Sequence, residues 1–308
     1  MSVTRGDVDD STSRPQAFWA RGLCLVLSAT GLAATAGANT SNGINLPLGV
    51  TSLSRMMYGL HMEVFWVCVV IAVLVFGVMI YALVKFRHSQ GAIPDTTMLH
   101  STKVEIIWTI VPIIILVALA IPAARGILFM EDMRDAQLSI RVTGYQWKWQ
   151  YQYMGEAEGI SFFSTLAQSS NFARQLHSGI DPKTVPNYLL DVDKPLVIPS
   201  GTKVRILLTS QDVIHAWWVP DFGAKRSAIP GFVNEIWFTV DPGKEGIYRG
   251  QCAALCGRDH GFMPIVVDVL TPADFKKWVE QQKAAVKQAA AHTGTEPRTA
   301  QLLPQTSN

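Results

Sequence analysis

The stretch Val64–Val84, VFWVCVVIAVLVFGVMIYALV, contains 21 residues without a charged side chain. A second stretch, Ile106–Ala124, contains 19 residues without a charge and reads IIWTIVPIIILVALAIPAA. A helix needs about 20 apolar residues to cross a bilayer, and internal prolines such as Pro112 and Pro122 are tolerated in membrane helices. The two stretches therefore predict a hairpin of two membrane helices, at about 64–84 and 106–124.

A shorter apolar run, at about 22–36, precedes the hairpin and follows Arg14 and Arg21. A basic flank, a short apolar run and an A-x-A-like end are typical of a secretory signal peptide. We expect cleavage near Ala38, which makes residues 1–38 a signal peptide; a first membrane helix is the alternative. With the mature chain starting outside, two crossings return the C-terminal part to the outer side. Basic residues between the two helices favour the cytoplasmic side for that loop, and they are Lys85, Arg87 and Lys103.

The composition agrees with a protein that lies partly in a membrane. Only 16% of the 308 residues are charged, against about 25% in an average soluble domain. The net charge of +2 predicts no nucleic-acid partner. There is no CxxCH motif, which excludes covalently attached haem of the c type on this chain.

The chain changes character at about residue 126. Short β-branched and aromatic runs alternate with turn signals, which predicts a small antiparallel sandwich or barrel. Residues 155–187 show no clear periodicity and are expected to form a long excursion between strands. We assign 39–125 to an N-terminal segment with the hairpin, 126–290 to this β domain with a C-terminal helix, and 291–308 to a disordered tail.

The chemistry of the chain lies in the segment QCAALCGRDHGFMP, residues 251–264. Within twelve residues it offers four soft donors, namely Cys252, Cys256, His260 and Met263. Thiolate, imidazole and thioether together suit copper rather than magnesium or calcium, and zinc sites use cysteine, histidine and carboxylates. A further histidine, His215, lies 37 residues before Cys252 in a strand-like segment. These five residues predict a copper site.

The second cysteine has a physical use. Two thiolates four residues apart can both bridge two coppers, leaving His215 for one metal and His260 for the other. Met263 would then be a weak axial ligand on one copper, and a backbone carbonyl between the cysteines would serve the other. The alternative is a Cys252–Cys256 disulfide, which an external compartment permits, with an incidental histidine and methionine.

Residues 55–282 resemble subunit II of the haem-copper cytochrome c oxidases. Five motifs carry the resemblance: the copper segment at 251–264, VEIIWTIVP at 104–112, GYQWKW at 144–149, DVIHAW at 212–217, and AIPG at 228–231. The resemblance implies a two-helix anchor followed by a cupredoxin domain, a Greek-key sandwich or barrel, that carries the binuclear copper centre CuA. It also implies that electrons arrive from cytochrome c and leave to a haem-copper catalytic subunit.

The resemblance assigns roles to further residues. Five aromatic residues alternate between Tyr145 and Tyr153, and in a single strand they would share one face. Most are expected to be packing residues, whereas Trp147 matches the tryptophan at which electrons enter. Glu105 matches the glutamate at the mouth of a proton pathway. Asp212 matches an acid of the cytochrome c docking surface, to which Asp191 and Asp193 are candidates to contribute.

Two positions depart from the family pattern. Ala254 stands where the family has glutamate, and Ser227 stands where it usually has aspartate. Both acids belong to the surroundings of a Mg²⁺ site shared with the catalytic subunit. Since the ligand from position 254 is a backbone carbonyl, we expect the two coppers to remain while the magnesium site is weakened.

The sequence thus predicts an α+β membrane protein, a helical hairpin followed by an all-β cupredoxin domain. Its expected function is to pass electrons from cytochrome c, through two copper ions, to a partner that reduces oxygen. The expected location is a bacterial-type inner membrane, multi-pass, with the C-terminal domain on the periplasmic side. A membrane-anchored copper carrier or assembly factor is one alternative. A quinol oxidase subunit II is another, which the complete ligand set disfavours.

Overall fold

The structure is a computed structural model that describes residues 45–91, 93, 97 and 100–293. The predicted signal peptide at 1–38 and residues 294–308 of the predicted tail lie outside the described residues.

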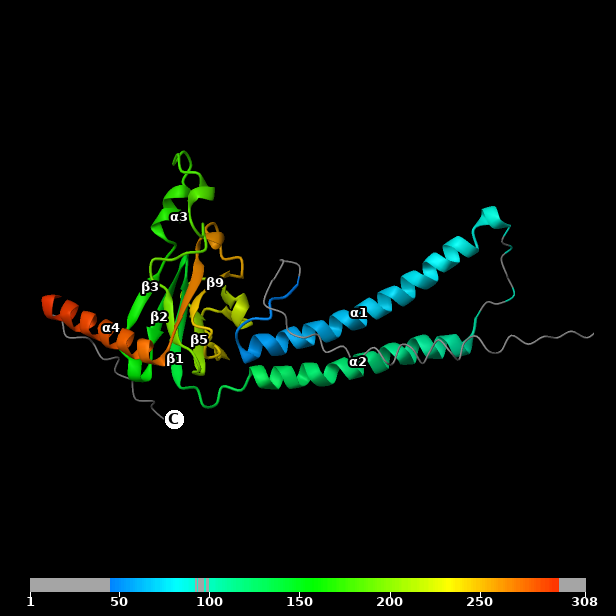
Figure 1. The fold of residues 1–308 in the computed structure, drawn as a ribbon, viewed down its shortest axis with the longest axis horizontal. Helices are drawn as coiled ribbons and strands as arrows, with labels where there is room; N and C mark the ends of the chain where they lie inside the picture. The colour runs from blue at the N-terminus through cyan, green and yellow to red at the C-terminus, as the bar shows by residue number, and fades with distance from the viewer. Residues whose placement is uncertain (1–44, 92, 94–96, 98–99, 294–308) are drawn as a thin grey trace, which may run out of the picture. The chain divides into compact units, whose positions relative to one another are not determined.

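Two long helices form the predicted hairpin and lie side by side (Figure 1). They are α1 (Ser52–Lys85) and α2 (Thr102–Met130). The short 3-10 helix η2 (His88–Gln90) lies in the segment that connects them. Both helices are long and apolar enough to cross a membrane, and their most apolar windows are not covered by the rest of the described chain. The membrane hairpin is therefore confirmed.

Both helices extend beyond the charge-free stretches that predicted them. α1 begins twelve residues before Val64, at a capping box. The Thr51 hydroxyl accepts a hydrogen bond from the Ser54 backbone amide, and the Ser54 hydroxyl accepts one from the Thr51 backbone amide. Such a cap satisfies amides that the first helical turn leaves without partners. The limits of the apolar stretch mark what the bilayer requires, whereas caps decide where a helix ends.

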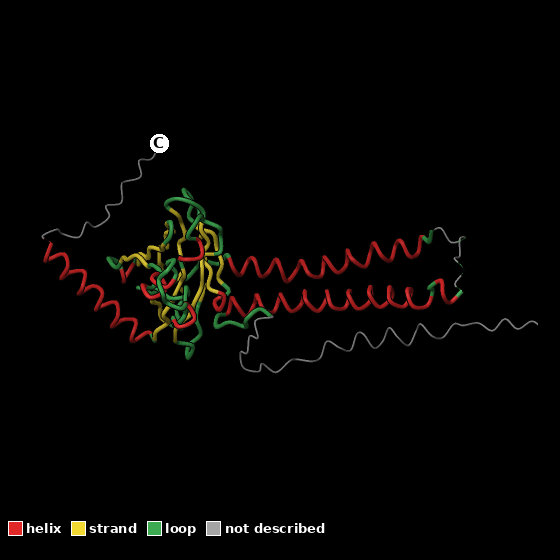
Figure 2. Tube along the Cα trace, turned by 90° about the horizontal axis from the view of Figure 1, so that it is seen from above, coloured by secondary structure: helices red, strands yellow, loops and turns green. Residues whose placement is uncertain are grey.

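Within the described residues, ten strands form two five-stranded sheets that pack on a shared core. The first sheet has the order β3–β2–β1–β5–β8, with bounds Ser161–Ser164, Lys148–Tyr153, Leu138–Tyr145, Val204–Ser210 and Asn234–Phe238. The second has the order β4–β10–β9–β6–β7, with bounds Leu196–Pro199, Pro264–Leu270, Gly246–Cys252, His215–Val219 and Ala224–Ala228. The sheets appear as yellow strands in Figure 2.

The sandwich is mixed rather than antiparallel, which corrects the prediction. β1 pairs with β5 in parallel, and β10 pairs with β4 in parallel. Both pairs join strands that are far apart in sequence, so local turn signals carry no information about their direction. Alternate residues of β5 point into the core between the sheets and are buried. Trp217 of one sheet stacks on Phe238 of the other, with ring centroids 5.9 Å apart.

The aromatic run 145–153 does not form a single strand, so the prediction of one shared face is wrong. β1 ends at Tyr145, and β2 begins at Lys148 and returns antiparallel to it. Trp149, Tyr151 and Tyr153 are buried in the core as expected. Trp147, by contrast, lies in the turn between the strands.

Helices also form outside the two sheets. The excursion at 155–187 contains β3, the helix α3 (Gln168–Ala173) and two 3-10 turns, η3 (Gly155–Ala157) and η4 (Pro182–Thr184), so it is not structureless. α4 (Pro272–Thr293) runs three residues past the expected end of the domain at 290 and packs Phe275, Trp278 and Val279 against the core.

The start of α1 contacts the β domain directly. The Thr51 hydroxyl donates to the Phe222 carbonyl over 2.8 Å, at the 3-10 turn η5 (Pro220–Phe222). Thr51 also forms an isolated bridge with Val240, and Arg55 forms an ion pair with Asp241.

Candidate metal centre

The segment that carries the soft donors connects β9 to β10. β9 ends at Cys252, β10 begins at Pro264, and the 3-10 turn η6 (His260–Phe262) lies between them. β6 lies beside β9, with Trp217 opposite Cys252, and the Ala253 amide donates to the Ala216 carbonyl over 3.0 Å. This pairing places His215, the first residue of β6, beside the cysteine segment.

All five predicted donors meet at this point. The Cys252 and Cys256 Sγ atoms are 3.9 Å apart. His215 Nδ1 lies 3.9 Å from Cys252 Sγ, and His260 Nδ1 lies 3.5 Å from Cys256 Sγ. Met263 Sδ is 3.6 Å from Cys256 Sγ. Each cysteine therefore faces its own histidine.

The distance between the sulfurs separates the two interpretations of the cysteines. A disulfide needs about 2.05 Å between its sulfurs, and both cysteines are free in this structure. The Ala254 carbonyl lies 3.4 Å from Cys252 Sγ. This carbonyl belongs to a residue between the two cysteines, which is where the copper interpretation expects a backbone ligand.

The orientation of His215 fits a metal ligand. Its side chain is fully buried, and Nε2 lies 2.9 Å from Asp212 Oδ1. A proton on Nε2 donated to this carboxylate leaves Nδ1 as a lone pair that faces Cys252. Metal-bound histidines usually have such a carboxylate partner, which fixes the tautomer. The residues present therefore fit a soft metal such as copper.

The two thiols differ in how readily they ionise. Burial opposes ionisation of Cys252, but its contacts with His215 and with neighbouring backbone groups outweigh burial and lower the pKa of this thiol. Burial and the nearby Cys252 charge raise the pKa of Cys256. Two thiolates at this separation repel each other, so a cation between them is needed to stabilise both.

Two glycines shape the centre, and sequence reasoning missed both as site residues. A Cβ on Gly144 would lie 2.7 Å from His215 Cδ2, so only glycine lets the imidazole lie against β1. Gly257 has φ +115°, and a Cβ there would lie 3.1 Å from both Trp147 Cζ2 and Gln146 Nε2. The sequence features that could have identified them are the motif GYQWKW, which begins with Gly144, and the position of Gly257 directly after Cys256.

Trp147 lies against the copper segment. Its indole Nε1 donates to the Cys256 carbonyl over 3.2 Å. The Gln146 side chain donates to the same carbonyl over 2.9 Å. The turn between β1 and β2 is thus attached to the backbone of a predicted ligand.

The three candidate docking acids all have intramolecular partners. Asp212 Oδ2 accepts from the Gln146 amide over 2.7 Å, and its Oδ1 accepts from the Val213 amide over 2.6 Å besides facing His215. Asp193 Oδ1 accepts from the Thr165 amide over 2.7 Å. Asp191 lies 3.8 Å from Arg249.

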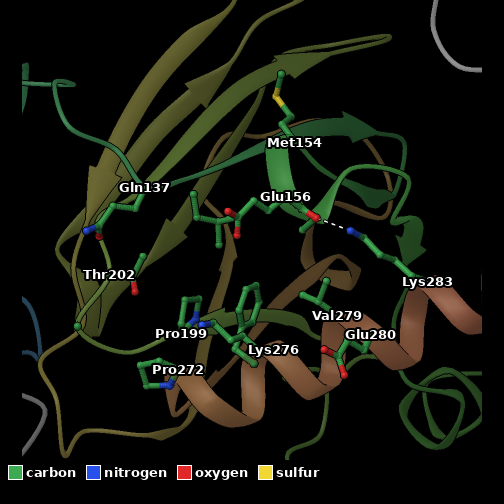
Figure 3. Close-up of a pocket in the computed structure, with 14 residues that line it drawn as sticks. Gln137, Met154, Glu156, Pro199, Thr202, Pro272, Lys276, Val279, Glu280 and Lys283 are labelled. Atoms are coloured by element: carbon green, nitrogen blue, oxygen red, sulfur yellow. Dashed lines mark hydrogen bonds between the residues drawn. The ribbon is translucent and has the colours of Figure 1, made fainter.

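The remaining predicted residues lie apart from the cluster. Glu105 is in the first turn of α2. Ser227 lies on β7, opposite Ala216, and its carbonyl accepts from the Asn234 side chain over 2.7 Å. A cavity of about 610 Å³ between α4 and the sandwich contains neither cysteine nor histidine among its lining residues (Figure 3). It is therefore separate from the metal cluster.

The fold and the donor cluster define a membrane-anchored β-sandwich protein with a candidate soft-metal centre. The family model for the periplasmic domain of cytochrome c oxidase subunit II matches residues 138–270. The model for the transmembrane domain of the same subunit matches residues 39–125. The chain belongs to the cytochrome c oxidase subunit II family, which makes it a component of a haem-copper oxidoreductase complex.

Two curated relatives agree with this assignment. The chain is 39% identical over 223 residues to "Probable cytochrome c oxidase subunit 2" of Rickettsia bellii, a match that covers 72% of this chain and 78% of the relative. It is 36% identical over 233 residues to cytochrome c oxidase subunit 2 of Arabidopsis thaliana, covering 75% of this chain and 86% of the relative. A solved structure, the periplasmic domain of the Bradyrhizobium japonicum subunit, matches with 39% identity and a TM-score of 0.41 over 49% of this chain and 97% of that one.

Proposed function

We propose that this chain accepts electrons from cytochrome c at a binuclear copper centre and passes them to the haem-copper catalytic subunit, where oxygen is reduced. The observation that carries the proposal is the pairing of two free cysteines, 3.9 Å apart, each with its own histidine. A single-copper site would need only one of these thiols.

Six residues would hold the two coppers. They are Cys252, Cys256, His215, His260, Met263 and, through its backbone carbonyl, Ala254. Bound there, the copper ions would supply one-electron redox chemistry. The protein contributes a buried, close-packed cluster whose ligands have little room to move when the charge changes.

Trp147 would be the residue through which electrons enter. Its indole is half-buried and donates to the carbonyl of Cys256, so one hydrogen bond connects the ring to a bridging ligand. Glu105, at the start of a membrane helix, would lie at the mouth of a proton pathway into the catalytic subunit.

The proposed location is the inner membrane of a bacterial-type cell, with the β domain on the periplasmic side. A copper carrier is disfavoured, because a carrier needs exposed and labile ligands. In this structure His215, Cys252, Cys256 and Met263 are all buried.

The test is the copper content of the purified full-length chain, together with electron paramagnetic resonance. We expect two coppers per chain and hyperfine splitting from two equivalent nuclei. Replacing Cys252 or Cys256 by serine should abolish that splitting, because each thiolate is needed as a bridge. One copper per chain, or splitting from a single nucleus, would contradict the binuclear centre.

A further inference from the structure

The two histidines of the metal cluster differ in how their positions are fixed. His215 is fully buried, and its Nε2 faces the carboxylate of Asp212 over 2.9 Å. His260 is only partly buried, and in the part of the chain that the structure describes no carboxylate contacts its ring. Histidines that bind metals usually have an outer partner that fixes the ring. The position of His260 therefore depends on the short turn that carries it.

One arginine, Arg174, contacts both ends of that turn. The turn is η6, and the Phe262 amide closes it by donating to the Asp259 carbonyl over 2.9 Å. Arg174 Nη1 lies 3.5 Å from Asp259 Oδ1, and the Arg174 guanidinium carbon lies 4.3 Å from the centre of the Phe262 ring. The Arg174 and Asp259 side chains are only 24% and 15% exposed, so solvent screens their attraction less than that of an open surface pair. Arg174 thus contacts the residue before His260 and the residue before Met263.

The other partner of Asp259 does not fix the turn. Arg258 lies 3.4 Å from Asp259, but its side chain is 82% exposed, and exposed ion pairs contribute little. Arg258 is also the next residue on the same loop, so it moves together with the turn. Of these two arginines, only Arg174 connects the turn to a different segment of the chain.

Arg174 itself comes from an anchored helix end. It directly follows α3 in the excursion at 155–187, and its Nε donates to Asn171 Oδ1 over 2.8 Å. Ser170 of α3 is fully buried, and its hydroxyl accepts from the Leu189 amide over 3.1 Å. The excursion, to which the sequence assigned no role, therefore brings a fixed guanidinium group to the metal loop.

We propose that Arg174 is a positioning residue for the metal centre. By contacting the two residues that precede ligands, it keeps His260 and Met263 beside the cysteines. The inference rests on the proposed function in taking the metal to be copper, whereas the contacts of Arg174 do not involve the metal. Without the guanidinium the turn would shift, which would weaken metal retention and change the ligand geometry although no ligand is replaced.

The first measurement uses the metal-free full-length chain. Arg174→Gln removes the guanidinium from both contacts. Hydrogen exchange of the backbone amides at 259–263, followed by mass spectrometry, should become about fivefold faster, the factor expected when an ion pair and a ring contact are lost. The matched control is Arg205→Gln, which removes a partly buried ion pair with Glu235 between β5 and β8. It should leave exchange at 259–263 unchanged.

The second measurement uses the copper-loaded chain. Arg174→Gln should release copper to a chelator about tenfold more readily, at the low end of what loss of an outer partner costs, and should change the hyperfine pattern of the resonance spectrum. Arg205→Gln should match the wild type in both. Arg174→Lys keeps the charge but not the planar stack on Phe262, so its copper retention should be intermediate.

A double-mutant cycle tests whether Arg174 acts through Asp259. Asp259→Asn should reproduce most of the loss of copper retention. The double variant Arg174→Gln/Asp259→Asn should cost little more than either change alone, because two residues that share one contact are not additive. Fully additive losses would contradict this route.

Wild-type copper retention in Arg174→Gln would overturn the inference, whether or not exchange at 259–263 increases, and so would equal losses in Arg174→Gln and Arg205→Gln. Circular dichroism identifies variants that fold; if Arg174→Gln does not, Arg174→Lys and Asp259→Asn test the same contact. Failure of the proposed function is distinguishable: the wild-type chain itself would then bind fewer than two coppers, while the exchange comparison on the metal-free chain would still decide whether Arg174 fixes the turn.

Discussion

At the scale of single residues, Asp212 connects two parts of the proposed site. One oxygen faces the His215 imidazole, and the other accepts from the amide of Gln146 beside Trp147. The resemblance gave Asp212 only as a candidate docking acid, although its position three residues before His215 also suits a carboxylate that contacts the histidine. Only the conformation of the loop decides which atoms it contacts, and a sequence pattern does not contain that information.

The contacts of Asp212 lead to a prediction that differs from that of a docking residue. Asp212→Asn should weaken copper retention by about 10- to 100-fold, because the partner of a ligating histidine is lost. Copper retention is measured by competition with a chelator. Asp191→Asn is the matched control, since Asp191 has no contact with a ligand in the described structure. A change confined to the salt dependence of electron transfer, with copper retention unchanged, would leave Asp212 as a docking acid only.

Trp147 allows electron transfer and copper binding to be separated. Trp147→Phe removes the indole donor to the Cys256 carbonyl but none of the proposed ligands. We expect normal copper content and a rate of reduction by cytochrome c that falls at least tenfold. Trp218→Phe is the control, a partly exposed tryptophan on β6. Equal rates in the two variants would make Trp147 a packing residue.

At the scale of elements, the sequence predicts helices and strands that have a regular residue pattern. It does not predict features that depend on residues far away in the sequence, such as strand pairing. The charge-free stretches located α1 and α2, and turn signals located the strands of the sandwich. The break at Gln146–Trp147 was missed because alternation continues on both sides of the turn. The parallel pairing of β1 with β5 was missed because it joins residues 138–144 to 204–210. Neither is encoded by local periodicity.

The role of α4 gives a prediction about stability. Trp278 packs on Tyr153 with ring centroids 5.3 Å apart. Trp278→Ala should lower the free energy of unfolding by about 2–4 kcal/mol, since a large packed aromatic side chain is removed. Val286→Ala, in the distal part of α4, should cost much less because Val286 is exposed. Thermal unfolding of the two variants measures the difference, and equal midpoints would show that α4 does not support the sandwich.

At the scale of the whole molecule, the metal cluster is built by the β domain alone. His215 comes from β6, Cys252 is the last residue of β9, and the other donors come from the β9–β10 connection. This part of the site was predictable from sequence, because soft donors at close spacing restrict the chemistry before any fold is known. The glycines and backbone amides around these donors were not predictable from the sequence, since their effect depends on neighbouring residues from other strands.

A fragment from Asp132 to Thr293 should therefore fold in water and bind two coppers. It lacks the Thr51 contacts with Phe222 and Val240, so we expect a lower melting temperature than that of the full chain. Circular dichroism and metal analysis provide the measurements. A fragment that folds but binds less than two coppers would show that the hairpin contributes to the site.

The missing carboxylate at position 254 concerns the whole oxidase. Mg²⁺ prefers oxygen ligands, usually one or two carboxylates with water, and this chain offers Ala254 and Ser227 instead. We expect the oxidase to bind two coppers here but little interfacial magnesium. Cells grown with Mn²⁺ should give an oxidase with little tightly bound manganese, and Ala254→Glu should increase it. Stoichiometric manganese in the wild type would contradict this expectation.

The two free cysteines limit when the proposed copper centre can form. Cys252 and Cys256 are close enough for a small movement of their loop to close the 3.9 Å between their sulfurs to bonding distance. Disulfides form readily outside the cytoplasm, so oxidation and copper compete for the same two atoms. Formation of the proposed copper centre therefore requires that both thiols stay reduced until the metal is bound. Under the proposed function, electrons are thus needed first to keep these two thiols reduced, before any can pass through bound copper.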